Sequence, residues 1–235
     1  MNQLTNIPKG FMNPSYLYFS SITQKIWMAL LGLFLIIFLV VHLGINLCLL
    51  RDDGGKWFTD AAHFMGTNYV VKVFEVILFG GFFLHILLGI ILQVKNWISR
   101  PVRYAITNKT KTPFLSKYMI YTGGIVFIFL VIHMMNFYFI KLGWVKSPVA
   151  LAEGGEPDFY STAIWLFGQP VYSVLYMALI VVLGVHLNHA FQAAFQTLGL
   201  QNKKYAPAIS IAGLCYSIII PFGFIIIPFY FLFIR

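Results

Sequence analysis

The sequence predicts an all-α integral membrane protein, a single domain over residues 1–235 with five transmembrane helices. Its composition is the first reason, because 60% of the residues are hydrophobic and only 10% are charged, whereas a soluble domain carries about 25% charged residues. The second reason is a series of five apolar runs, each close to the ~20 residues that cross a bilayer as a helix. The third is that each of the first four runs carries a histidine well inside it, namely His42, His85, His133 and His186.

The five spans are expected at 26–50, 73–94, 118–140, 171–195 and 208–233. Pro221 and Pro228 lie in the last span, where we expect a kink because proline lacks a backbone donor and clashes with the preceding turn. The loop over 147–170 is rich in turn residues and is expected to hold a short surface helix. The polar N-terminal segment predicts no secretory signal. Cys48 and Cys215 lie in different runs, which argues against a disulfide framework, a zinc site and covalently attached haem.

Charge predicts the orientation. Basic residues without acidic ones lie in the N-terminal segment, the second loop and the fourth loop, namely Lys9, Lys25, Lys95, Arg100, Arg103, Lys109, Lys111, Lys117, Lys203 and Lys204. All 7 acidic residues fall on the other side. The positive-inside rule therefore places the N-terminus in the cytoplasm and the C-terminus outside. The net charge of +9 is therefore no evidence for binding to nucleic acid. The basic face either results from the positive-inside rule, with some attraction to anionic membrane lipid, or docks a soluble partner.

Four histidines form two levels in the predicted bundle. Counted at ~1.5 Å per residue, His42 and His133 lie about 10–12 Å from the outer ends of their runs, and His85 and His186 about 14 Å from the inner ends. We interpret them as the axial ligands of two haem irons, an outer pair His42/His133 and an inner pair His85/His186, in a haem-binding bundle of the first four helices. The alternative is four independent hydrogen-bonded histidines. No carboxylate or thiolate lies at either level to complete a small-ion site.

Gly81 and Gly89 flank His85 at four-residue spacing, so all three share one helix face. Bare backbone on both sides of an imidazole would give a flat macrocycle the clearance that it needs, and both glycines are therefore candidate haem contacts. The alternative is that they permit close helix packing in lipid.

Further candidates lie nearer the inner surface. His189 follows His186 by three residues and is expected to bond a haem propionate or a water rather than bind a metal. Lys25, Ser21 and Arg103 are candidate propionate partners, each with the alternative of a plain interfacial residue. His63, in the first outer loop, is expected at the surface.

Glu75 is the one carboxylate placed inside an apolar run below the outer surface. The functional interpretation is proton exchange with a quinol beside the outer haem, with His63 and Asp60 as rival residues. The alternative is a carboxylate that reaches the interface or pairs with Lys72 three residues earlier.

The chain resembles the five-helix, di-haem cytochrome b anchor subunit of succinate:quinone oxidoreductases (succinate dehydrogenase and quinol:fumarate reductase), most closely the version found in Bacteroidetes and related bacteria. The resemblance covers nearly the whole chain and is weakest in the two outer loops. The residues that carry it are Ser20-Ser21-Ile22, Lys25, Met28-Ala29, His42-Leu-Gly-Ile-Asn46-Leu47, Glu75, His85, Tyr121-Thr122-Gly123, His133 and the segment from Gly184 through His186 and His189 to Leu200.

The resemblance implies two haem b groups and a location in the bacterial cytoplasmic membrane. It also implies a soluble iron–sulfur subunit and a FAD flavoprotein subunit on the cytoplasmic face, where succinate and fumarate interconvert. This chain, which has no flavin motif, would exchange electrons with the quinone. Menaquinone is favoured because such anchors handle it near the outer haem with a carboxylate nearby, which fits Glu75. Some members carry a proton-returning glutamate in the fourth helix; the segment Leu183-Gly184-Val185 has none.

Two other functions stay open at the level of sequence. A quinone-linked di-haem anchor of a hydrogenase or formate dehydrogenase would share the same histidine pattern. A histidine-relay transporter would need more polar residues at mid-membrane depth than the runs contain, since Asn46, Gln93, Asn136 and Asn188 lie mostly near span ends.

Overall fold

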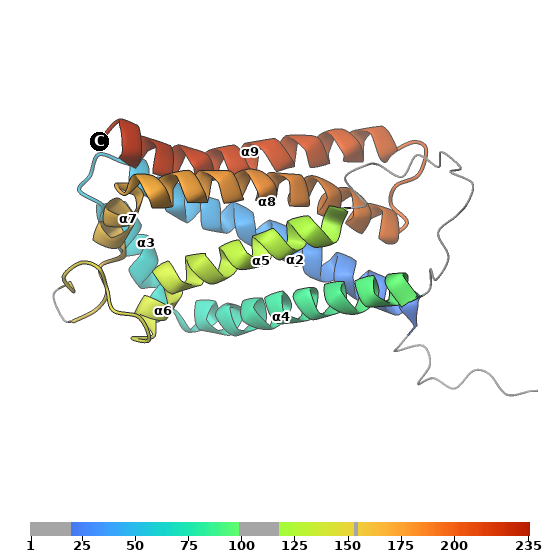
Figure 1. The fold of residues 1–235 in the computed structure, drawn as a ribbon, viewed down its shortest axis with the longest axis horizontal. Helices are drawn as coiled ribbons and strands as arrows, with labels where there is room; N and C mark the ends of the chain where they lie inside the picture. Colours follow the sequence, from blue (N-terminus) through green and yellow to red (C-terminus); the bar gives the residue numbers. More distant parts are fainter. Residues whose placement is uncertain (1–19, 99–117, 153–154) are drawn as a thin grey trace, which may run out of the picture.

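The structure is a computed structural model that describes residues 20–98, 118–152 and 155–235. Its described part contains helices and no strands, and five of its helical segments are long and apolar enough to cross a membrane (Figure 1). They are α2 (Ser21–Leu47) with the short η1 (Cys48–Leu50), α4 (Tyr69–Ile98), α5 (Met119–Asn136) with α6 (Tyr138–Lys141), α8 (Pro170–Thr197) and α9 (Ala206–Phe233). For the described residues the predicted all-α class is confirmed, and so is the prediction of five helices long and apolar enough to cross a membrane.

Helices α2 and α4 extend beyond the predicted apolar runs at their polar ends. The hydroxyl of Ser20 accepts a hydrogen bond from the N–H of Thr23 at 3.2 Å. This N-cap starts α2 five residues before the predicted span. The polar residues that follow Val94 likewise continue α4 to Ile98. The expected boundaries were therefore too short at the polar helix ends.

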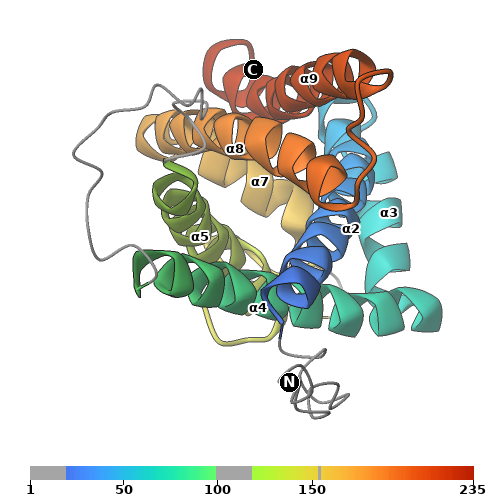
Figure 2. The ribbon, with the colours of Figure 1, turned by 90° about the vertical axis from the view of Figure 1, so that its right-hand side faces the viewer.

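Four of the long helices surround the middle of the bundle, and α9 lies against α8 and α2 (Figure 2). Helix α2 packs against α4, α8 and α9, whereas α5 packs mainly against α8. Helices α4 and α5 touch each other only slightly. Consistent with this loose packing, Gly81 is the only buried residue of α4, and α5 has none.

Two short helices close one end of the bundle, which we call the capped end; the C-terminus lies there too (Figure 1). They are α3 (Lys56–Thr67) and α7 (Phe159–Phe167). Helix α7 confirms the short helix predicted in the loop over 147–170 but not its surface location, because Thr162, Ala163, Leu166 and Phe167 are buried. The carboxylate of Asp158 caps α7 by accepting from Ser161 N at 3.0 Å. Helix α3 was not predicted. Phe58 of α3 and Phe167 of α7 share a buried cluster with Tyr176 of α8.

The prolines at which we predicted a kink, Pro221 and Pro228, do not interrupt α9, which is one continuous helix through both of them. Pro221 has no N–H for the carbonyl of Ser217, four residues earlier. Gly184 of α8 lies against this point: a Cβ at Gly184 would lie 2.9 Å from Ser217 O and 3.1 Å from Pro221 Cγ. Gly184 thus serves the close packing of α8 on α9.

Replacing Gly184 with alanine is expected to lower the free energy of unfolding by about 1–3 kcal/mol, the usual effect of overpacking a close contact. Thermal unfolding of the purified protein in detergent measures the effect. Gly124→Ala is the matched control, because no atom lies within 4 Å of a Cβ built there. Equal midpoints for the two variants would contradict the close approach of α8 and α9.

Candidate functional site

The first feature of the interior is a pair of histidines toward the capped end. His42 of α2 and His133 of α5 face each other with ring centroids 5.6 Å apart and ring planes at 84°. They come from the first and third spans, which run in the same direction, and the chain between them includes all of α3 and α4 (Figure 1). The structure therefore brings together the two residues predicted as the outer pair.

Aromatic rings enclose this pair. Phe38 stacks on His42 with a centroid distance of 5.2 Å, and Phe224 of α9 lies 5.7 Å from the same ring. Phe137 lies 5.2 Å from the ring of His133. These rings pack on both imidazoles, and neutral imidazole is the form in which histidine ligates metals.

Asn46 lies one turn after His42. Its amide Nδ2 donates to the backbone carbonyl of His42 at 2.7 Å and lies 3.4 Å from the ring Nδ1. The second distance is longer than an ordinary hydrogen bond. Asn46 therefore anchors the backbone of His42 and leaves its ring tautomer to be set by whatever the ring binds.

The two histidines of the predicted inner pair each lie over a glycine of a neighbouring helix. A Cβ at Gly32 of α2 would lie 3.7 Å from Cε1 of His85, and a Cβ at Gly123 of α5 would lie 3.4 Å from Cε1 of His186. Within the described residues, neither ring makes an aromatic contact, so His85 and His186 are not in ring contact with each other. Each imidazole instead lies over the bare backbone of a neighbouring helix.

Thr122 orients His186. Its hydroxyl donates to the carbonyl of Met119 at 3.0 Å, so its oxygen is left as the acceptor for the Nδ1 of His186 at 3.3 Å. A hydroxyl has only one proton to give. The contact thus favours the tautomer of His186 with Nδ1 protonated and a free lone pair on Nε2, as a metal ligand requires.

Gly81 and Gly89 face side chains of α2. A Cβ at Gly81 would lie 3.2 Å from the ring of Phe34, and one at Gly89 would lie 3.4 Å from the methyl of Met28. The predicted haem contact of both glycines stays a prediction beside the alternative of close helix packing. The glycines that lie against histidine rings are Gly32 and Gly123.

Among the residues that the structure describes, two buried ring nitrogens have no hydrogen-bond partner, namely Nδ1 of His85 and Nε2 of His189. Most buried polar atoms are paired, so an unpaired imidazole nitrogen points to a ligand. In the part of the chain that the structure describes, no group of three or more His, Cys, Asp or Glu residues could hold a metal ion. The facing imidazoles of His42 and His133 could instead hold a flat cofactor that brings its own equatorial ligands.

The other predicted inner contacts lie toward the end of the bundle opposite the capped end. Ser21 and Lys25 are exposed in the first turns of α2, and His189 is half-buried in α8. Lys95 at the end of α4 donates to Oε1 of Gln24 at 2.9 Å and links α4 to α2 there. Arg103 lies outside the described residues.

Glu75 lies near the start of α4, toward the capped end. Its Oε1 accepts from the hydroxyl of Tyr138 at 2.7 Å, and its Oε2 accepts from Lys141 Nζ at 2.9 Å. The structure thus pairs this carboxylate with the end of the third span, in place of the considered pair with Lys72. The side chains of Glu75 and Lys141 are 25% and 35% exposed, so the cluster is reachable from outside the bundle.

Sequence reasoning assigned no role to Thr122, Tyr138 or Lys141. A signal existed for Lys141, because it ends the third run at about the depth at which Glu75 begins the second. No such signal existed for Thr122 before the resemblance, since one hydroxyl in an apolar run more often bonds its own helix. Comparison with protein-family models, curated proteins and solved structures finds no match to this chain, so its function is inferred from these residues.

Proposed function

We propose that this chain is the di-haem cytochrome b membrane anchor of a succinate:quinone oxidoreductase, and that it carries electrons between an iron–sulfur subunit and a quinone. The observation that carries the proposal is the meeting of His42 and His133, in ring contact at 5.6 Å from two different spans. Further support comes from the orientation of His186 by Thr122 and from the unpaired nitrogen of His85.

In this proposal His42 and His133 hold the outer haem, and His85 and His186 hold the inner haem. Bound haem supplies a one-electron carrier whose reduction potential depends on its axial ligands and surroundings. The protein supplies the rest: Phe38, Phe137 and Phe224 keep water from the outer pair, and Thr122 holds the ring of His186 in one orientation.

Glu75 is proposed to exchange protons with the quinone, for which menaquinone is the favoured candidate. A quinone takes up two protons when it is reduced, so its site needs a group that can accept and release a proton within hydrogen-bond reach. Tyr138 and Lys141 hold both oxygens of Glu75. These two residues act as positioning residues, because they fix the direction in which the carboxylate faces.

The soluble partners are proposed to dock at the end opposite the capped end, on the cytoplasmic side of a bacterial inner membrane. Lys95 lies there, and so do Lys203 and Lys204 between α8 and α9. No acidic residue offsets the charge of these two lysines in the segment that joins α8 to α9, because the sequence has none after Asp158. A basic surface of this kind suits an acidic face on the iron–sulfur subunit, which bears the FAD subunit. Succinate and fumarate would react at the flavin, and not on this chain.

Purification of the chain in mild detergent with its native partners tests the proposal. The preparation is expected to contain an iron–sulfur and a FAD subunit, two haem b groups per anchor by the pyridine haemochrome assay, and succinate oxidation or fumarate reduction coupled to a quinone analogue. One haem or none would refute the di-haem assignment. If a hydrogenase or formate dehydrogenase subunit co-purifies in place of the flavoprotein, the chain is the anchor of that respiratory complex instead.

Thr122→Val is expected to raise the reduction potential of one haem and to weaken its retention roughly tenfold, because loss of a partner of this kind reduces ligand basicity and metal affinity by about 10–100-fold. Redox titration and haem loss on dilution in detergent measure the two effects. Thr67→Val is the control, since the hydroxyl of Thr67 bonds His63 O on exposed α3. A response of both haems, or of neither, would contradict the contact with His186.

A further inference from the structure

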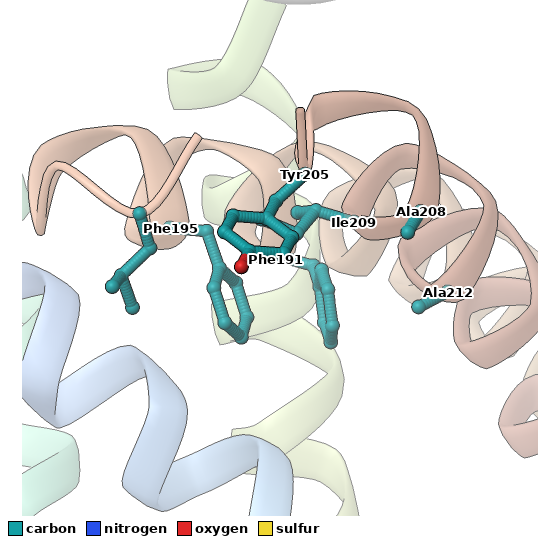
Figure 3. Close-up of a pocket in the computed structure, with 7 residues that line it drawn as sticks. Phe191, Phe195, Tyr205, Ala208, Ile209 and Ala212 are labelled. Carbon is teal, nitrogen blue, oxygen red and sulfur yellow. The ribbon is translucent and has the colours of Figure 1, made fainter. Parts of the chain in front are cut away.

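A second apolar site lies between the end of α8 and the start of α9, away from the four histidines. It is a groove of about 390 Å³, within the range of small-molecule sites. Phe191 and Phe195 of α8 line one side, and Ala208, Ile209 and Ala212 of α9 line the other, and the ring of Tyr205 also lines the groove (Figure 3). None of these side chains carries a charge.

The walls of the groove are preformed. Phe191 stacks on Phe195 with a centroid distance of 4.8 Å and on Tyr216 at 6.0 Å. Gly213 makes room for this stack, because a Cβ there would lie 2.9 Å from Cδ1 of Phe191. On the facing helix, the alanines at 208 and 212 leave the space open over one full turn. The shape suits a narrow, flexible hydrocarbon chain.

A basic pair stands at the mouth. The side chain of Asn202 accepts the backbone N–H groups of Lys204 and Tyr205 at 3.0 and 3.1 Å, which fixes the turn before α9. Nζ of Lys204 lies 5.2 Å from the centroid of the Tyr205 ring, which itself lines the groove. Lys203 is exposed beside it. The charge therefore lies where the apolar lining ends.

We propose that this groove binds one anionic phospholipid, with an acyl chain against Phe191, Phe195 and Ala212 and the headgroup phosphate at Lys203 and Lys204. Because α8 and α9 are apolar enough to span a membrane, the turn between them lies at the depth of the lipid headgroups. A lysine near an anionic membrane surface favours the negative headgroup over a neutral one. A soluble partner could meet the lysines, but would not supply the hydrocarbon that the groove accommodates.

Native mass spectrometry of the purified protein, exchanged into dioleoyl phosphatidylglycerol or dioleoyl phosphatidylcholine, tests the site. We expect one tightly retained phosphatidylglycerol and no retained phosphatidylcholine. Lys203→Gln/Lys204→Gln is expected to weaken phosphatidylglycerol retention about thirtyfold. Lys72→Gln is the matched control, because Lys72 also lies over a tyrosine ring near a helix start, at 5.8 Å from Tyr69, but beside no groove.

Filling the groove gives an independent arm. Ala212→Phe and Ala208→Phe replace exposed alanines and are expected to abolish retention, whereas Leu214→Phe, at a 50% exposed position outside the lining, is expected to leave it unchanged. Circular dichroism verifies that each variant keeps its helices. Retention of both lipids alike, or full retention in the filled variants, overturns the proposal. So does a quinone retained in place of the phospholipid, or lysine variants that release soluble subunits while lipid retention is unchanged.

Discussion

Replacing His85 with alanine is expected to lower the haem content from two per chain to one, and to leave the haem held by His42 and His133 in place. His85 is the one histidine that α4 offers to this level of the bundle. His189 cannot replace it from the opposite side, because it lies on α8 with His186. The pyridine haemochrome assay and a redox titration, in which one of two steps disappears, measure the loss.

His63→Ala is the control for this experiment, because His63 is exposed on α3 and should leave both haems bound. The reciprocal variant His42→Ala is expected to remove the other redox step and to spare the one lost in His85→Ala. Loss of both haems from a variant that keeps its helical circular dichroism would contradict the two independent pairs. Loss of the same step in both variants would contradict the assignment of partners.

The five helices could be predicted because a backbone in lipid must satisfy its own hydrogen bonds, so each long apolar run had one available structure. The exact ends could not, since Ser20 and Asp158 set them through hydrogen bonds that hydropathy does not register. Helix α3 could not be predicted because it is not a long apolar run. It is short and carries Lys56, Asp60 and His63 among its apolar residues, a mixture that also suits a loop.

The candidate site also has a part that could be predicted and a part that could not. Depth along a helix follows from a fixed rise per residue, so the levels of His42 and His133 could be estimated from residue numbers alone. Which neighbour covers a helix face depends on how the helices are rotated about their axes, and the sequence does not give that rotation directly. For this reason the sequence could not predict that Phe34 covers Gly81, that Gly123 lies against His186, or that Lys141 pairs with Glu75.

Glu75→Gln is expected to lower quinone-linked turnover roughly a hundredfold, the contribution of a general acid or base. An amide keeps the size of the side chain and an acceptor for the hydroxyl of Tyr138, but it cannot take up and release a proton at neutral pH. Haem content should be unchanged, because the two oxygens of Glu75 bond Tyr138 and Lys141 and not any of the four histidines. Lys141 is left without its ion pair, yet it is partly exposed and can be hydrated, so stability should change little.

The measurement compares turnover with a quinone analogue against turnover with a soluble dye that takes electrons before they reach this chain. Only the first should fall in Glu75→Gln. Glu156→Gln, at an exposed loop position, is the matched control for loss of a carboxylate. Tyr138→Phe should give a smaller loss, because it removes one of two groups that position the carboxylate. Unchanged quinone turnover in Glu75→Gln would transfer proton exchange to Asp60 or His63, which also lie toward the capped end on α3.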